Sequence, residues 1–190
     1  MARIIAGQGK GRRLKAPKGL DTRPTGARVR QSLLDILAPR LPGSRFLDLC
    51  AGSGGVGLEA LSRGAACVVF VDLSAAATQV VRANLGILGQ TGGEAQVFRQ
   101  DAQTALRGFA QGGRRFDLIY LDPPYESALY EPLLNAVSDL GVLEGDGVLV
   151  AEHFHKRALP ETIGRLVLFR AVRVGDHVLS FYRFRQEETG

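Results

Sequence analysis

The segment Asp122-Pro123-Pro124-Tyr125 is the most distinctive group of chemically useful residues in this chain of 190 residues. Each proline fixes its own φ angle and has no N–H, so the loop presents acceptors without competing backbone donors. The Asp122 carboxylate and the Pro123 carbonyl are therefore expected to form a rigid pair of hydrogen-bond acceptors. The alternative is a purely structural role, in which the segment is a Pro-Pro turn followed by an aromatic residue of the core.

Two acceptors in fixed positions suit a planar exocyclic amino group, which offers two N–H donors. The nitrogen of such a group is a poor nucleophile because its lone pair is delocalised into the ring. Fixed acceptors orient that nitrogen and stabilise the positive charge that develops as it attacks a methyl group. Tyr125 offers a face on which an unstacked base can lie. The segment thus predicts methylation of a nucleobase amine, with Asp122, Pro123, Pro124 and Tyr125 as the catalytic residues.

A glycine-rich turn lies upstream, in the stretch Asp48-Leu-Cys-Ala-Gly52-Ser-Gly54-Gly55-Val-Gly57. Gly52, Gly54 and Gly57 form a G-x-G-x-x-G pattern after an apolar run, and Asp72 follows 20 residues after Gly52. Glycines let the backbone approach a ligand closely, and a carboxylate after the next strand accepts hydrogen bonds from ribose hydroxyls. The pattern fits two cofactors, a nicotinamide dinucleotide or S-adenosylmethionine (SAM).

Asp48 favours SAM over the dinucleotide. A dinucleotide would place its pyrophosphate near this carboxylate, which would repel it, whereas SAM brings an ammonium and a sulfonium, which the carboxylate attracts. Asp48 could instead brace the turn by accepting backbone N–H groups. Asp101, after a third apolar run, is expected either to accept the adenine amino group or to cap a helix that begins near Ala102.

The candidate residues follow apolar runs of the sequence, which would position them. Five such runs predict strands over 45–50, 67–72, 95–99, 116–122 and 147–152. Helical patterns separate them: one runs from Ala27 to Pro39, one from the glycine turn to about 63, one from Ser74 to about 88, and two lie around 102–109 and 129–140. Alternating strands and helices predict an α/β fold with a mostly parallel sheet. The runs 166–174 and 178–185 predict a C-terminal antiparallel hairpin, which makes seven strands.

Positive charge is concentrated at the N-terminus of the chain. Residues 1–30 hold nine Lys and Arg residues against one acid, while the net charge of the whole chain is +5. Such a segment attracts polyanions, because each phosphate that it neutralises releases counterions. Its glycines and prolines predict a small hairpin or arm. We expect residues 1–25 to form this arm and residues 26–190 a single domain; a solvated arm without a partner is the alternative.

Several classes of protein are excluded or disfavoured. No apolar run approaches the roughly 20 residues that a membrane-spanning helix needs, and the first residues are too soon broken by Gly7 to form a signal peptide. Two cysteines make no disulfide scaffold. His153 and His155 lack a convincing third ligand, so we expect no metal. We expect a cytoplasmic monomer.

Four blocks of the sequence resemble the RsmD family, whose members methylate N2 of guanine 966 in 16S ribosomal RNA. The blocks are Arg3-Ile-Ile-Ala-Gly with Gly11-Arg-Arg-Leu, Arg23-Pro-Thr25 with Arg28-Val-Arg30, Asp48-Leu-Cys-Ala-Gly-Ser-Gly with Gly57-Leu-Glu-Ala-Leu-Ser-Arg-Gly64, and Asp-Pro-Pro-Tyr. The resemblance implies a Rossmann-like SAM-dependent methyltransferase that acts on 16S rRNA, in our expectation within a small-subunit particle. Gly26 and Ala27 depart from the Thr-Asp usual in the family.

The resemblance also implies roles for individual residues. Asp122 and Pro123 would hold the guanine amino group, while Asp48, Gly52 and Gly54 would surround the methionine part of SAM, Asp72 its ribose and Asp101 its adenine. The full predicted cofactor set is Asp48, Cys50, Ala51, Gly52, Ser53, Gly54, Asp72, Leu73, Asp101, Ala102 and Asp122. The predicted RNA-binding set is Arg3, Lys10, Arg12, Arg13, Arg23, Pro24, Thr25, Arg28 and Arg30.

Other classes of protein could also account for these motifs. A DNA adenine-N6 methyltransferase uses similar loop chemistry but typically carries a larger target-recognition region, and a protein-glutamine methyltransferase would not need the basic arm. A nicotinamide oxidoreductase would use the same glycines. A non-catalytic RNA-binding protein would bind RNA and transfer no methyl group.

Overall fold

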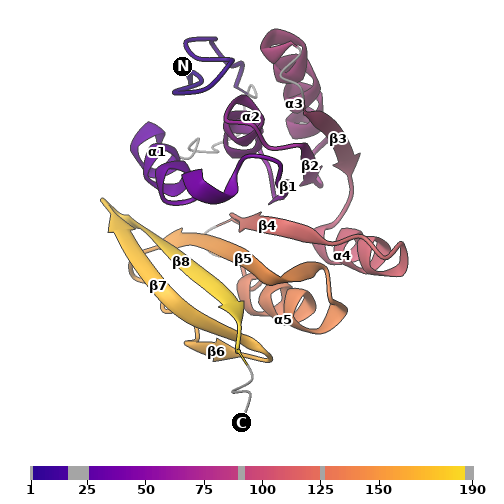
Figure 1. Ribbon diagram of the computed structural model, residues 1–190, viewed down its shortest axis with the longest axis vertical. Coiled ribbons are helices and arrows are strands. Elements are labelled where there is room, and N and C mark those ends of the chain that lie inside the picture. Colours follow the sequence, from indigo (N-terminus) through magenta and orange to yellow (C-terminus); the bar gives the residue numbers. More distant parts are fainter. Residues whose placement is uncertain (1, 17–25, 90–92, 125–126, 187–190) are drawn as a thin grey trace. The chain divides into compact units, whose positions relative to one another are not determined.

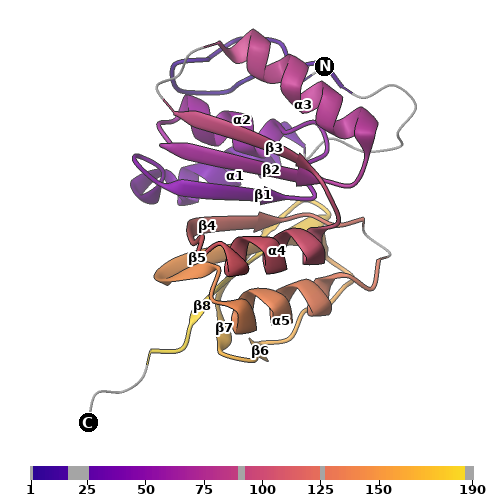
Figure 2. The same cartoon turned by 90° about the vertical axis from the view of Figure 1, so that its right-hand side faces the viewer.

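The computed structural model describes residues 2–16, 26–89, 93–124 and 127–186. The chain forms two compact units, Met1–Ala102 and Gln103–Gly190. Each unit combines strands with helices, which confirms the predicted α/β class (Figures 1 and 2). Among the described residues, no helix has the length and apolarity that crossing a bilayer requires.

The first unit contains three parallel strands in the order β3-β2-β1. They are β1 (Arg45–Leu49), β2 (Cys67–Asp72) and β3 (Glu94–Arg99). The middle residues of β2 are buried, as expected for a continuous apolar run covered on both faces. The register pairs Leu49 with Val71 and Asp72 with Arg99, so all three strands end at the same edge.

Helices α1 (Ala27–Ile36), α2 (Gly55–Ser62) and α3 (Ala75–Leu88) complete the first unit, with a 3-10 turn η1 (Ala38–Arg40) after α1. Ser74 caps α3 as predicted, since its hydroxyl accepts the N–H of Ala77 at 3.2 Å. Helix α2 packs on β1 and β2, and α3 on β2 and β3. Gly57 permits the close approach of α2, because a Cβ there would overlap the Phe70 ring and lie 2.9 Å from Val68 Cγ1.

Residues 2–16 form a small hairpin in the first unit. Arg3 and Arg13 form an antiparallel bridge, and the N–H of Ile4 donates to the carbonyl of Arg12 at 3.0 Å. Ile4 and Leu14 are each only 2% exposed. The basic segment therefore begins as a hairpin with its own apolar anchors, which buries hydrophobic surface between its charged residues.

The second unit begins in α4 (Ala102–Gln111) and continues through β4 (Phe116–Leu121), α5 (Tyr130–Leu140), β5 (Leu143–Phe154), β6 (Thr162–Ile163), β7 (Leu166–Val174) and β8 (His177–Phe184). Its strand order is β4-β5-β8-β7-β6. β4 and β5 are parallel, and the remaining pairs are antiparallel. Helices α4 and α5 lie along β4 and β5 in Figure 2.

The strands and helices expected from the sequence are all present, and the C-terminal hairpin is confirmed as β7 and β8. The described residues hold eight strands instead of the seven predicted, because β6 has only two residues and leaves no periodic signal. β5 is longer than predicted. Its first half contains Gly145, Asp146 and Gly147, which interrupt the apolar pattern although the backbone stays extended.

Candidate functional site

The glycine loop after β1 has an unusual backbone conformation. Gly52 and Gly54 have φ angles of +56° and +76°. Cys50 has a φ of +66°, and among the described residues it is the one non-glycine with a positive φ. A side chain in this region is strained by roughly 1–3 kcal/mol, and such strain concentrates at functional sites. The glycines adopt these angles without strain, so the strain of the loop is concentrated at Cys50.

Backbone hydrogen bonds hold this loop in place. The N–H of Ala51 donates to the carbonyl of Val71 at 2.9 Å, and the N–H of Gly54 donates to Ala51 at 2.8 Å. The N–H of Gly52 donates to Asp72 Oδ2 at 2.8 Å. These bonds tie the loop to the end of β2, so the predicted glycine and carboxylate positions do come together.

Asp48 is buried beneath the loop, with 1% of its surface exposed. Its Oδ2 accepts the N–H of Gly57 at 2.9 Å, so the carboxylate braces the start of α2. The pKa of Asp48 is raised to about 7: burial is the main cause, the hydrogen bond from Gly57 partly offsets it, and the negative charge of Asp72 adds a smaller rise. The ionised form is costly without a nearby cation, and a cationic ligand would lower this pKa.

Asp72 and Leu73 form the rim of the loop at the end of β2. Asp72 Oδ1 accepts the N–H of Ser74 at 2.8 Å while Oδ2 accepts that of Gly52. Each carboxylate oxygen has two lone pairs, so Asp72 can still accept hydroxyl groups. Leu73, the next residue, is 68% exposed and offers an apolar side chain to solvent. A ligand with a sugar and a flat ring matches this pair.

Asp101 lies two residues after β3, at the same edge of the parallel strands, and its side chain is exposed. Ala102 begins α4. The predicted cofactor residues of the first unit thus gather where β1, β2 and β3 end, the edge at which ligands of open α/β sheets bind. They are Asp48, Cys50, Ala51, Gly52, Ser53, Gly54, Asp72, Leu73, Asp101 and Ala102.

The Asp-Pro-Pro segment follows β4 in the second unit. Asp122 is half-buried, Pro123 is buried and Pro124 is exposed. The carbonyl of Pro124 accepts the N–H of Ser127 at 2.8 Å. Tyr125 lies outside the described residues.

Tyr130 and Glu152 support this segment, and the sequence did not identify them as functional. The Tyr130 hydroxyl lies 2.9 Å from the carbonyl of Glu152, to which it donates, and 3.4 Å from the carbonyl of Pro123. The buried Glu152 carboxylate accepts the Tyr120 hydroxyl and lies 2.7 Å from His177 Nδ1. The position of Glu152 at the end of an apolar run could have marked it as a candidate site residue. The sequence around Tyr130 gives no such signal, because an aromatic residue in a helix is typical of the core.

The predicted RNA-binding residues divide into three groups. Arg3, Lys10, Arg12, Arg13 and Arg28 are exposed. Arg23, Pro24 and Thr25 lie outside the described residues.

Arg30 is the exception, because it is 2% exposed and its guanidinium donates to the carbonyl of Arg3 at 2.8 Å. Its Nε lies 3.9 Å from a carboxylate oxygen of Glu59. The expectation that Arg30 faces RNA is therefore corrected: its charge serves to hold the hairpin.

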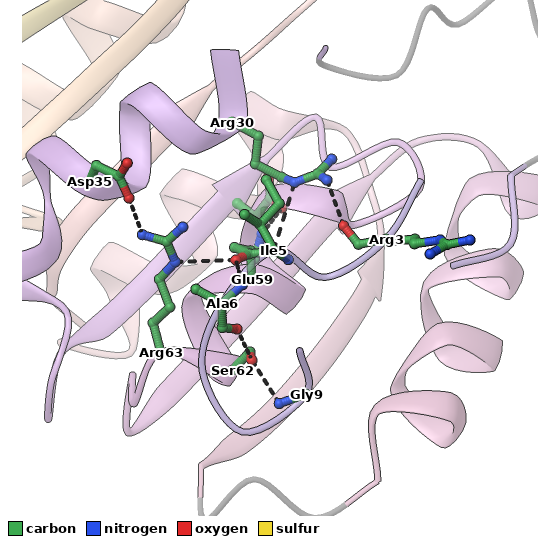
Figure 3. Close-up of polar contacts among 11 residues, drawn as sticks. Arg3, Ile5, Ala6, Gly9, Arg30, Asp35, Glu59, Ser62 and Arg63 are labelled. Carbon is green, nitrogen blue, oxygen red and sulfur yellow. Dashed lines mark hydrogen bonds and ion pairs between the residues drawn. The ribbon is translucent and has the colours of Figure 1, made fainter. Parts of the chain in front are cut away.

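Glu59 and Ser62 on α2 are two further residues that sequence reasoning missed (Figure 3). The Glu59 carboxylate is fully buried and accepts the N–H groups of Ile5 and Ala6, each at 2.8 Å. Ser62 accepts the N–H of Gly9 at 2.9 Å and donates to the carbonyl of Ala6 at 2.5 Å. The hairpin is thus docked on α2 through its backbone, while the Arg12 side chain donates to the carbonyl of Ile87 on α3 at 3.0 Å.

Within the part of the chain that the structure describes, no three metal-ligating side chains form a cluster. His153 instead contacts Ser180 Oγ through Nε2 at 2.8 Å, and burial lowers its pKa, so that the neutral ring is favoured.

Comparisons with known proteins place the chain in a family. The family model described as "Conserved hypothetical protein 95" matches residues 2–183. YlbH of Bacillus subtilis (strain 168) is 44% identical over 183 residues, covering 96% of this chain and 99% of YlbH. Ribosomal RNA small subunit methyltransferase D of Escherichia coli (strain K12) is 35% identical over 181 residues, 95% of this chain and 89% of that protein.

A solved structure agrees with these relatives over nearly the whole chain. yhhF from Escherichia coli is 34% identical, with a TM-score of 0.81, and the match covers 98% of this chain and 99% of that one. The Rossmann-like fold expected from the sequence is thereby confirmed. The chain belongs to the "Conserved hypothetical protein 95" family, that is, to the RsmD family of SAM-dependent rRNA methyltransferases, as its sequence motifs indicated.

Proposed function

We propose that this enzyme methylates the exocyclic N2 of a guanine in 16S rRNA, guanine 966 in the usual numbering, and that it acts without a metal. The main observation in favour of an amine as the methyl acceptor is the Asp-Pro-Pro segment after β4, where a half-buried carboxylate precedes two prolines. Ribosomal RNA small subunit methyltransferase D of Escherichia coli, 35% identical, supports the RNA class.

The residues of the first unit suit SAM. A buried carboxylate whose pKa is raised to about 7 gains from a cationic ligand, and Asp72 with the exposed Leu73 offers a ribose acceptor beside an apolar surface. SAM, when bound, supplies a methyl group on a positively charged sulfur. Asp48 and the loop Cys50–Gly54 would hold its methionine part, Asp72 its ribose, and Leu73, Asp101 and Ala102 its adenine.

The residues of the second unit suit the target amine. Asp122 and the Pro123 carbonyl would accept its two N–H groups, which orients the nitrogen lone pair and stabilises the positive charge as the N–C bond forms. The S–C bond to the methyl group would break at the same time, with neutral S-adenosylhomocysteine as the leaving group, and the methylated nitrogen would then lose one proton to solvent. Tyr125 would stack on the base after it leaves its own stack. Tyr130, whose hydroxyl lies 3.4 Å from the Pro123 carbonyl, would hold that acceptor in place.

The exposed basic residues would bind phosphates and position the RNA without reading its sequence. They are Arg3, Lys10, Arg12, Arg13, Arg23 and Arg28, with Pro24 and Thr25 in the same segment. We place the reaction in the cytoplasm, on a small-subunit ribosomal particle, with the enzyme as a monomer. Arg30 does not belong to this set because it is buried.

The decisive test is the Asp122→Ala variant, assayed with tritium-labelled SAM on 16S rRNA and on small subunits from a strain that lacks the enzyme. Methyl transfer should disappear while SAM affinity stays within a few fold. Glu161→Ala, which removes an exposed carboxylate elsewhere in the second unit, should keep wild-type transfer. Loss of SAM binding in Asp122→Ala, with normal turnover per bound SAM, would contradict the assignment.

Mapping the modified base on the labelled RNA then tests the target. Label at guanine N2 supports the proposal, and label on an adenine of a DNA substrate would favour the adenine-N6 alternative. RNA binding without any transfer by the wild-type enzyme would indicate a non-catalytic RNA-binding protein. Oxidation of NADH in place of methyl transfer would indicate an oxidoreductase.

A further inference from the structure

Asn84 on α3 joins two parts of the first unit that are far apart in sequence. Its Oδ1 accepts the N–H of Lys15 at 2.7 Å, and its Nδ2 donates to the carbonyl of Lys15 at 3.1 Å. The same Nδ2 donates to the carbonyl of Ser53 at 3.1 Å. Lys15 lies at the end of the hairpin, and Ser53 lies in the cofactor loop, so one side chain touches both.

The chemistry of this position requires an amide. Asn84 is 0% exposed and lies in the buried stripe of α3 with Ala77, Val81 and Leu88. An apolar side chain would leave the Lys15 N–H and the Ser53 carbonyl without this partner, which is costly in the interior. A carboxylate would supply acceptors alone, whereas the site needs one acceptor and two donors. Because Lys15 N–H donates to it, Oδ1 is the oxygen, so the orientation of the amide is determined.

Two further anchors of the hairpin lie on α2. Glu59 and Ser62 bind the backbone of residues 5–9 from α2 (Figure 3). Asn84 binds the hairpin at Lys15, the last part of the described hairpin before the segment that carries Arg23-Pro-Thr25. The hairpin is therefore attached to α2 through Glu59 and Ser62, and Arg12 also joins it to α3 at Ile87. Asn84 attaches its other end both to α3 and to the cofactor loop.

We propose that Asn84 is a positioning residue that couples RNA binding on the hairpin to SAM binding on the cofactor loop. This inference rests on the proposed function, since it takes the hairpin as the RNA-binding segment and the loop as the SAM-binding one. RNA that contacts the hairpin near Lys15 would stabilise the two hydrogen bonds that orient the Asn84 amide, and the same amide binds the Ser53 carbonyl. Coupling of this kind is reciprocal, so bound SAM must tighten RNA binding by the same factor.

The test compares Asn84→Ala with Ser62→Ala. Both variants loosen the hairpin, but Asn84→Ala alone removes a hydrogen bond from the cofactor loop. The Kd for SAM is measured with and without RNA, and hydrogen exchange is measured in the protein without ligands. Both variants should weaken RNA binding. We expect Asn84→Ala alone to raise the Kd for SAM about fivefold, the effect of one lost hydrogen bond, and to speed exchange over residues 50–54.

The ratio of the SAM Kd values with and without RNA reports the coupling. It should differ from one in the wild type and in Ser62→Ala, and return to one in Asn84→Ala. Asn84→Ser is measured in parallel because it keeps a polar group in the buried site, and urea unfolding confirms that each variant folds. An unchanged SAM Kd, ratio and exchange over 50–54 in a folded Asn84 variant would overturn the inference.

Failure of the proposed function gives a different result. If the wild type neither binds SAM nor transfers a methyl group, the proposed function is wrong. Exchange over residues 50–54 in Asn84→Ala still reports whether the amide links the hairpin to the loop. Binding and transfer by the wild type, together with identical behaviour of Asn84→Ala and Ser62→Ala, reject the coupling alone.

Discussion

Replacement of Asp48 by asparagine should change how the stability of the protein depends on pH. Burial raises the pKa of Asp48 from 3.8 to about 7 in the folded protein. In the unfolded chain the carboxyl group is solvated and titrates near its ordinary value. The asparagine side chain of the variant would not titrate, and its amide oxygen can still accept the N–H of Gly57 that Asp48 now binds at 2.9 Å.

The magnitude follows from the difference between the two pKa values. Below pH 4 the carboxyl group is protonated in both states, and its contribution to stability is fully present. Between pH 4 and 7 the unfolded chain loses this proton and the folded protein keeps it, so the free energy of unfolding falls as pH rises. A difference of about three pKa units corresponds to about 4 kcal/mol at pH 7 and above.

Urea unfolding of the wild type and Asp48→Asn, followed by circular dichroism at pH 5, 6, 7 and 8, checks this. Other groups titrate in both proteins, so the quantity of interest is the stability of the variant minus that of the wild type. This difference should grow by about 1.4 kcal/mol per pH unit up to pH 7 and then level off. A difference that is constant from pH 5 to 8 would refute the reasoning, because Asp48 would then be ionised throughout.

Three further predictions concern packing, the hairpin and RNA. Gly57→Ala should lower the free energy of unfolding by about 1–3 kcal/mol in urea, because the added methyl group overlaps the Phe70 ring. Gly7→Ala, at a φ of +79° and against the Ser62 carbonyl, should displace the hairpin and speed hydrogen exchange over residues 2–16. Arg13→Ala should reduce the salt slope of RNA binding by about one, measured by fluorescence anisotropy at several salt concentrations; an unchanged slope would remove Arg13 from the interface.

Local patterns in the sequence were sufficient for much of the fold. Continuous apolar runs predict β1 and β2 because strands covered on both faces need no polar alternation. Ser74 predicts the start of α3, and its capping bond is present. The glycine pattern and Asp72 predict a turn after β1, and the bond from Gly52 to Asp72 ties the two together. Each of these signals lies within a few residues of the feature that it specifies, or within one β-α-β repeat.

Only the tertiary structure shows which charged and polar side chains are buried and bind the backbone of distant segments. In the sequence, Arg30 cannot be distinguished from the other basic residues near the N-terminus. In the structure, its guanidinium is buried and donates to the backbone carbonyl of Arg3. Glu59 and Asn84 read as ordinary helix residues, yet each binds a hairpin backbone more than 50 residues away. Sequence periodicity reports which face of an element is apolar. It contains no information on which distant N–H or carbonyl will meet a side chain once the elements pack, and that meeting sets the role of Asn84. The raised pKa of Asp48 likewise depends on packing, because burial of the carboxyl group is its main cause.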